Sequence, residues 1–241
     1  MQHWKHEDIP CVLTRGPWIA TASGGMWSLL NPHPNDVKIC DIAAGLSRSC
    51  RYAGQIREDV DFYAVSEHSV LMLEWLEAQG AIEYKEDAVK ILLHDGSEGY
   101  LVDMASPLKA VLPEFRNIEN LAQTAIERSF GLEHARISKE IIKSIDVRIR
   151  MDEREALINE PALSHQKRVV WEHTPDMEGL GVTIRGLSPR ETRREFLEAF
   201  VRICEHEPYA FRNPQSAEAI LHHYEEAKKL LEPPAEAVPS L

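Results

Sequence analysis

Four side chains of the types that bind divalent cations follow one another in the order His, His-Asp, Asp. They are His68, the adjacent pair His94 and Asp95, and Asp146. Two imidazoles and two carboxylates suit a hard-to-borderline ion such as Mn, Co, Fe, Zn or Mg. Because an isolated His-Asp pair is usually an ordinary polar pair, the prediction depends on all four residues together. The sequence predicts one divalent metal ion per chain, held by these side chains.

A further carboxylate accompanies the adjacent pair. Glu98 follows His94 by four residues and Asp95 by three, and on a helix these spacings place side chains on one face. We expect such a helix over residues 83–98, with the pair near its C-terminal end and facing a cavity. Glu98 would then orient the attacking water or accept its proton.

Four segments of the chain resemble the HD-domain metal-dependent phosphohydrolases. They read DIAAGLSRSCRYAGQ, YAVSEHSVLML, ILLHDGSEGYLVDMASPLK and SIDVRIRMDEREALI. The similarity extends over about residues 36–160 and is greatest to the compact bacterial and phage branch, which contains 5′-deoxynucleotidases and deoxynucleoside triphosphate triphosphohydrolases. The resemblance implies that the metal ligands are His68, His94, Asp95 and Asp146, and that Glu98, together with Asp95, is catalytic.

The same resemblance implies a nucleotide site. Its residues would be Arg51, Tyr52, Gln55, Asp103 and Lys109. The planar fork of Arg51 and the point charge of Lys109 suit phosphate oxygens, and Tyr52 would lie near the sugar or base. Taken singly, these residues have ordinary interpretations: a salt-bridge arginine, a solvated loop lysine, a core tyrosine and a turn-capping aspartate.

The function that follows is cleavage of the 5′ phosphoester of a (deoxy)nucleotide. A monophosphate would yield nucleoside and phosphate, and a deoxynucleoside triphosphate would yield nucleoside and triphosphate. Two alternatives stay open: a hydrolase of signalling nucleotides, and a catalytically inactive HD domain that binds or regulates. The sequence shows no added ligand motif of the kind that dinuclear signalling members carry, and it retains all four ligands together with Glu98.

Composition limits the partners. The chain has 241 residues, 44% hydrophobic and 27% charged, which is enough for one sizeable core. A net charge of −12 without a basic stripe argues against nucleic-acid polymers. No apolar run is long enough to cross a membrane, and the four cysteines are scattered, as in reduced cytoplasmic proteins. We therefore expect a cytoplasmic protein without membrane contact, and the resemblance implies a homodimer or higher homo-oligomer.

The predicted fold is all-α: an HD-domain helical bundle with a small N-terminal β-hairpin and a C-terminal helical elaboration. We expect a hairpin or extension in residues 1–35, the catalytic core in 36–160, the elaboration of the same domain in 161–231, and a disordered tail in 232–241.

Local signals place the individual elements. Gly24-Gly25 between two β-prone runs predicts the hairpin, and Asp36 and Ser66 are candidate caps of the first two helices. "SPRE" at Ser188 is a capping-box signature, and Asn213-Pro214 starts the last helix. The remaining expectations are a helix at about 114–130, one at about 134–158, an irregular loop over 99–113, and a short strand in LGVTIRGL.

Overall fold

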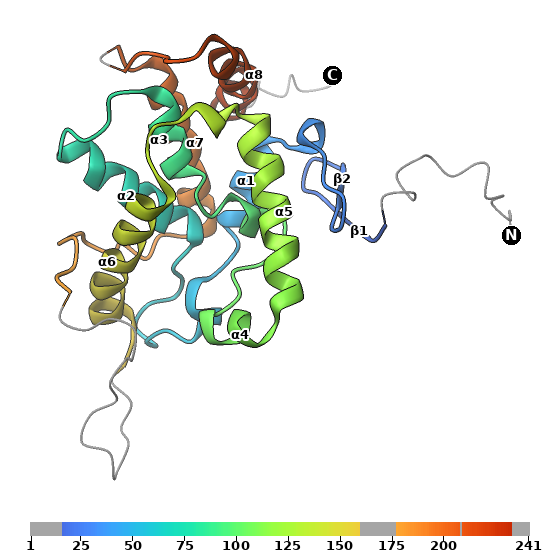
Figure 1. Cartoon of the computed structure of the whole chain (residues 1–241). Coiled ribbons are helices and arrows are strands. Elements are labelled where there is room, and N and C mark those ends of the chain that lie inside the picture. Colours follow the sequence, from blue (N-terminus) through green and yellow to red (C-terminus); the bar gives the residue numbers. More distant parts are fainter. Residues whose placement is uncertain (1–15, 160–176, 208, 233–241) are drawn as a thin grey trace, which may run out of the picture.

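The computed structural model describes residues 16–159, 177–207 and 209–232. This part of the chain is mostly helical with one small hairpin (Figure 1). In chain order the elements are β1 Trp18–Ala20, β2 Met26–Ser28, η3 Pro34–Asp36, α1 Ile39–Leu46, η4 Arg51–Gly54, α2 Val65–Ala78, α3 Lys85–Leu92, η5 Gly96–Gly99, α4 Ser106–Val111, α5 Pro113–Ser129, η6 Leu132–His134, α6 Lys139–Leu157, α7 Pro189–Glu205 and α8 Pro214–Leu231. The predicted all-α class with a small hairpin is confirmed.

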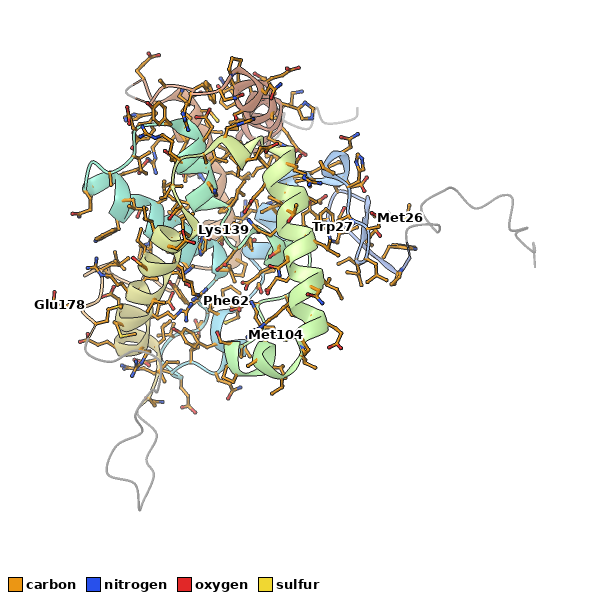
Figure 2. The ribbon with its side chains drawn as sticks, in the orientation of Figure 1. Met26, Trp27, Phe62, Met104, Lys139 and Glu178 are labelled. Atoms are coloured by element: carbon orange, nitrogen blue, oxygen red, sulfur yellow. The ribbon has the colours of Figure 1, made fainter. Side chains whose placement is uncertain are left out.

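The hairpin pairs β1 with β2 in antiparallel register, with Ile19 opposite Trp27. Successive strand residues point to opposite faces, and Figure 2 shows Trp27 on the inner side of the hairpin and Met26 farther out. Trp27 is fully buried and stacks on Tyr100 with ring centroids 3.9 Å apart. This contact fixes the hairpin to the segment that follows η5.

The C-terminal helices belong to the main core. Helix α7 packs on α8 and also on α1, α2 and α3. Phe196, Phe200 and Ile203 of α7 are fully buried, and the Phe200 ring meets Phe130 edge-on at 5.8 Å. The predicted helical elaboration therefore completes the bundle.

Both C-terminal helices start where the sequence predicts. Ser188 and Glu191 form the capping box of α7, with the Ser188 amide donating to the Glu191 carboxylate at 2.9 Å. The Asn213 side chain accepts the amides of Gln215 and Ser216, at 2.8 and 3.3 Å, at the start of α8. These local bonds satisfy helix amides that would otherwise lack a partner.

The first two helices begin at other residues than expected. Asp36 ends η3, and α1 starts after Lys38. Ser66 lies inside α2, whose N-cap is Ala64. The reason at α2 is a tertiary contact: Cys50 and Ala64 form an isolated antiparallel bridge, so the backbone is extended up to Ala64 and turns helical directly after it.

Three further expectations are wrong. The helix expected from residue 134 begins at Lys139, because the Asp87 carboxylate accepts the amides of Arg136 and Ile137, at 2.6 and 2.8 Å, and holds them outside the helix. Helix α4 lies within the expected irregular loop. No strand forms in the described segment 177–187, because its amides pair with the side-chain carboxylates of Asp152 and Glu67 instead of a neighbouring strand.

The remaining expectations concern residues 161–176, the C-terminal tail, membrane crossing and the cysteines. The predicted tail lies outside the described residues apart from residue 232, and so do all of residues 161–176. Within the part that is described, no helix has the length and apolar character needed to cross a membrane. Cys40, Cys50 and Cys204 are free thiols.

Candidate metal centre

The His94-Asp95 pair lies in a turn, not on a helix. Helix α3 ends at Leu92, and the pair connects it to η5, which carries Glu98. The single helix expected over residues 83–98 is therefore wrong. In the turn, adjacent residues can direct their side chains to one point, which is harder on a regular helix where neighbours diverge by about 100°.

Two contacts from distant parts of the chain hold this turn. The Gln123 side chain on α5 donates to the Leu93 carbonyl at 2.9 Å and accepts the Ser97 amide at 3.1 Å, so it brackets the pair from both sides. On the other side, a Cβ atom at Gly45 of α1 would overlap the Gly99 carbonyl oxygen. The absence of a side chain at Gly45 thus lets α1 and η5 pack backbone to backbone.

His68 is fully buried in the first turn of α2, where the sequence predicts it. Its Nε2 atom lies 3.3 Å from Nε2 of His94 and 3.8 Å from Oδ2 of Asp95. Nε2 of His94 is also 3.2 Å from Oδ2 of Asp95. One ligand atom from each of the three residues therefore lies within 4.8 Å of the others, so the three converge on one point.

The contacts of the two Nδ1 atoms indicate which nitrogen of each imidazole carries a proton. Nδ1 of His94 lies 2.9 Å from the Ile91 carbonyl, which can only accept, so this nitrogen carries the proton. Nδ1 of His68 lies 2.6 Å from Oε1 of Glu153 and carries a proton for the same reason. When both imidazoles are neutral, their Nε2 atoms then present lone pairs to each other and to a carboxylate oxygen. A cation between them removes the repulsion, and hydrogen-bonded imidazoles of this kind are typical metal ligands.

The charges around the cluster agree with a cation. Burial raises the pKa of Asp95, but the neighbouring His94 and then His68 bring it below its ordinary value, so the carboxylate stays ionised. Burial and Arg51 lower the pKa of His68, yet the carboxylates of Glu153 and Asp146 raise it overall. The site therefore attracts positive charge, which a proton on His68 or a metal ion can supply. The donor set fits a divalent ion.

Asp146 lies beside the cluster on α6. Its Oδ1 atom is 3.5 Å from Nε2 of His68, and its Oδ2 atom accepts from Lys143 at 2.7 Å and from Arg150. The compact group of three does not include it. Its role as the fourth ligand stays a prediction, in which Oδ1 would complete the site while the two basic residues hold Oδ2.

Glu153 is a site residue that the sequence analysis did not predict. Its fully buried carboxylate accepts from His68, Arg51, Tyr52 and Tyr63, at distances from 2.6 to 3.2 Å. Burial raises its pKa, but Arg51 and His68 lower it to about 2. Its position seven residues after Asp146, two helical turns along the same face, is the signal that could have indicated this role.

Glu98 is buried, and one of its oxygens lacks a partner. Oε1 accepts from Lys109 at 2.9 Å, and Lys109 also binds Glu119 at 2.6 Å. Among the described residues no group bonds to Oε2. Burial, with smaller contributions from Asp95 and Asp103, raises the pKa of Glu98 well above its ordinary value. A carboxyl group with these properties can hold or accept a proton inside the cavity.

Arg51 and Tyr52 come from a strained turn. Tyr52 and Ala53 have φ values of 59° and 53°, a left-handed conformation that costs of order 1–3 kcal/mol for such residues and is often found at functional sites. The turn brings Nη1 of Arg51 to 3.7 Å from Oδ2 of Asp95 and the Tyr52 hydroxyl to 2.7 Å from Glu153.

A cavity of about 610 Å³ opens beside the cluster of His68, His94 and Asp95. Its size suits a small-molecule ligand. Of the predicted site residues, those in its wall are Arg51, Tyr52, His94, Asp95, Glu98, Asp103, Lys109 and Asp146. His68 lies buried behind this wall. Gln55 is exposed and outside the wall, because the left-handed turn directs the chain away after Tyr52, so the structure does not bring it into the site. The basic residues Arg116, Lys143, Arg150 and Arg154 line the cavity and were not predicted.

Comparison with known proteins gives two similar bacterial sequences. The chain is 33% identical over 115 residues to the uncharacterized protein YfdR of Escherichia coli strain K12, and 34% identical over 116 residues to the uncharacterized protein RCAP_rcc00048 of Rhodobacter capsulatus. Each match covers 48% of this chain and 59% of the relative, so the chain spans about three fifths of the relatives' length. Neither name states an activity. No protein-family model matches the chain.

Proposed function

We propose that the protein is a metal-dependent phosphohydrolase that cleaves the 5′ phosphoester of a nucleotide. The observation that carries the proposal is the convergence of three ligand atoms, two from imidazoles and one from a carboxylate, at a cavity whose wall also holds Arg51 and Lys109. The predicted resemblance to HD-domain phosphohydrolases supports the same conclusion.

Each residue would have its own role in the proposed hydrolysis. His68, His94, Asp95 and Asp146 would hold the ion, which when bound lowers the pKa of a water molecule and polarises a phosphoryl oxygen. Arg51 would donate to phosphate oxygens, since Glu153 fixes its guanidinium at 3.2 Å beside the cluster. Glu98 would take a proton from the attacking water through its unpaired Oε2 oxygen.

Lys109 would keep Glu98 in place while adding positive charge near the transferring group. Asp103 lies in the cavity wall, where its carboxylate can accept a sugar hydroxyl. Tyr52 offers an aromatic face at the same wall, although its hydroxyl is committed to Glu153. The proposal therefore assigns residues to both requirements of phosphoryl transfer, which are positioning of the reacting groups and neutralisation of their charge.

The direct test is a substrate panel. Purified protein, stripped with a chelator and reloaded separately with Mn, Co, Mg, Zn or Fe, is incubated with nucleoside 5′-monophosphates, 5′-triphosphates and, as a control for the cleaved position, 3′-monophosphates. We expect hydrolysis of a 5′ substrate only, dependent on added metal, and separation of phosphate from triphosphate products identifies the bond that is cut. Binding of metal without hydrolysis of any nucleotide would contradict the proposal and favour a binding or regulatory role.

A further inference from the structure

Residues 178–187 form a segment without helix or strand that passes beside α6 and leads into α7 (Figure 1). We call this segment the strap. Among the described residues that line the cavity, none belongs to the strap. Figure 2 shows Glu178 on one side of α6 and Met104, which is in the cavity wall, on the other. The strap therefore lies behind the candidate site and cannot touch a ligand in the cavity.

Two side chains of α6 hold the first part of the strap. Arg148 donates to the carbonyls of its first two residues, at 3.2 and 3.0 Å. Asp152 accepts the amides of the next two, at 2.7 and 3.1 Å. A Cβ atom at Gly179 would overlap the Asp152 carboxylate, so a glycine is needed for this close approach. The Arg148 guanidinium also lies 5.0 Å from the centre of the Trp75 ring, so it contacts α2 as well as the strap.

The last three residues of the strap bind a single carboxylate of α2. Glu67 is fully buried. It accepts the amides of Arg185, Gly186 and Leu187, at 2.7, 3.1 and 3.0 Å. Gly186 has a φ of +64°, a left-handed conformation that favours glycine and helps successive amides to converge on one anion. Because a buried carboxylate without donors is costly, this contact fixes the end of the strap on α2.

Each of the two acidic anchors is the neighbour in sequence of a residue in the candidate metal site. Glu67 precedes His68, and Asp152 precedes Glu153. Neighbours on a helix diverge by about 100°, so one residue of each pair can face the strap while the other faces the site. The contact between His68 and Glu153, with Nδ1 and Oε1 2.6 Å apart, thus lies between the two helices that the strap joins.

We propose that the strap is a positioning element of the candidate metal site. It holds α2 and α6 at the separation that brings His68 to Glu153 and to Asp146, whose Oδ1 atom is 3.5 Å from Nε2 of His68. The inference rests on the proposed function, because it takes the cluster around His68 to bind a divalent ion. Glu67 and Asp152 would not touch the ion, but they set the position of the residues that orient its ligand.

The experiment releases the strap and measures the metal site without any substrate. Glu67→Ala leaves three amides without their acceptor, and Glu67→Gln keeps one accepting oxygen. The matched control is Glu86→Ala, because Glu86 is also a fully buried glutamate and accepts the amides of Arg212 and Asn213 before α8. Chelator-stripped protein is titrated with Co(II), whose visible absorption bands record both the affinity and the ligand geometry.

We expect Glu67→Ala to bind Co(II) about 10- to 100-fold more weakly and with altered absorption bands. Glu67→Gln should lie between this variant and the unmodified protein. Chemical denaturation should find comparable losses of unfolding free energy in Glu67→Ala and Glu86→Ala, because both remove a buried acceptor of amides. The control should nevertheless keep the Co(II) affinity and bands of the unmodified protein. A Co(II) site that is unchanged in Glu67→Ala, or equally altered in Glu86→Ala, would overturn the proposal.

A second variant tests the α6 end of the strap and does not depend on the folding of Glu67→Ala. Asp152→Asn keeps the size of the side chain but replaces one of its two accepting oxygens. We expect a smaller change of Co(II) affinity and bands in the same direction. Unaltered Co(II) binding in Asp152→Asn would overturn the proposal as well.

The positioning role and the proposed function fail in different ways. Altered Co(II) binding in Glu67→Ala, without hydrolysis of any nucleotide by the unmodified protein, would support the strap and contradict the phosphohydrolase. Unchanged Co(II) binding in Glu67→Ala, with metal-dependent hydrolysis by the unmodified protein, would overturn the strap and support the phosphohydrolase. An unmodified protein that binds no divalent ion would contradict both.

Discussion

The turn from His94 to Gly99 and the helix pair α7–α8 are held in place in opposite ways. Each of the two helices starts with its own local cap, at Ser188 and Asn213, and buries one apolar face. The turn depends on side chains and backbone from elsewhere: Gln123 of α5 and Gly45 of α1.

This difference has a consequence for mutations. Local caps contribute to the stability of one helix, so their loss should change the free energy of unfolding and leave chemistry unaffected. Distant contacts at the turn set the positions of ligands, and displacements of about 1 Å can reduce catalysis strongly. Mutations far from the His94–Gly99 turn in sequence should therefore affect the candidate metal site. Mutations in the α7–α8 pair should not affect it.

The largest effect is expected at Glu98. Replacing Glu98 by Gln keeps its shape but removes its ability to accept a proton, so kcat should fall by roughly 10²–10⁴-fold with little change in metal content or KM. Glu119→Gln is the matched control, because Glu119 shares Lys109 with Glu98. Near-normal turnover with bound metal in Glu98→Gln would show that Glu98 is structural.

A smaller but still large effect is expected where α1 meets η5. Gly45→Ala should destabilise the protein by about 3 kcal/mol or more, because the new Cβ would overlap the Gly99 carbonyl oxygen. Chemical denaturation measures this free energy. The comparison variant is Gly80→Ala, where φ is +62° and space is open, so it should cost only about 1 kcal/mol. Equal costs would refute the tight contact.

Glu153→Gln tests how the buried carboxylate positions His68 and Arg51. The amide cannot balance the buried guanidinium or accept as strongly from Nδ1 of His68, so metal affinity should fall about 10- to 100-fold. Calorimetric metal titration provides the measurement, and Glu155→Gln, exposed on the same helix, is the control. Unchanged metal affinity in Glu153→Gln would mean that His68 is oriented by packing alone.

The smallest effect is expected in the C-terminal pair. Ser188→Ala removes the capping box of α7 and should cost about 1 kcal/mol of stability. Metal content and kcat should stay at the values of the unmodified protein. A loss of metal in this variant would show that the α7 cap and the candidate metal site are not independent of each other.

The sequence predicts one of these regions much better than the other. Ser188, Pro189 and Asn213 act within a few residues of themselves, so the starts of α7 and α8 are correct. The sequence also predicts His68, His94 and Asp95 as candidate ligands, and these three side chains do lie together. The sequence does not predict the irregular path of the turn, because this path depends on Gln123 and Gly45, which are distant from the turn in sequence.

The same reason explains the other differences. The sequence did not predict Glu153 as a site residue, because its four partners come from η4, α2 and the segment before α2. Asp87 delays the start of α6 through a contact across about fifty residues. Gln55 lies outside the cavity because the left-handed residues Tyr52 and Ala53 redirect the chain, and such strain is not visible in a residue pattern.

Metal content measured together with phosphate release tests the central claim most directly. The double variant His94→Ala/Asp95→Ala is compared with the unmodified protein and with His222→Ala/Asp59→Ala, which removes an exposed histidine and an exposed aspartate. Elemental analysis should find one divalent ion per chain in the unmodified protein and the control, and none in the double variant, which should also release no phosphate from a nucleotide. A full complement of metal in His94→Ala/Asp95→Ala would contradict the account.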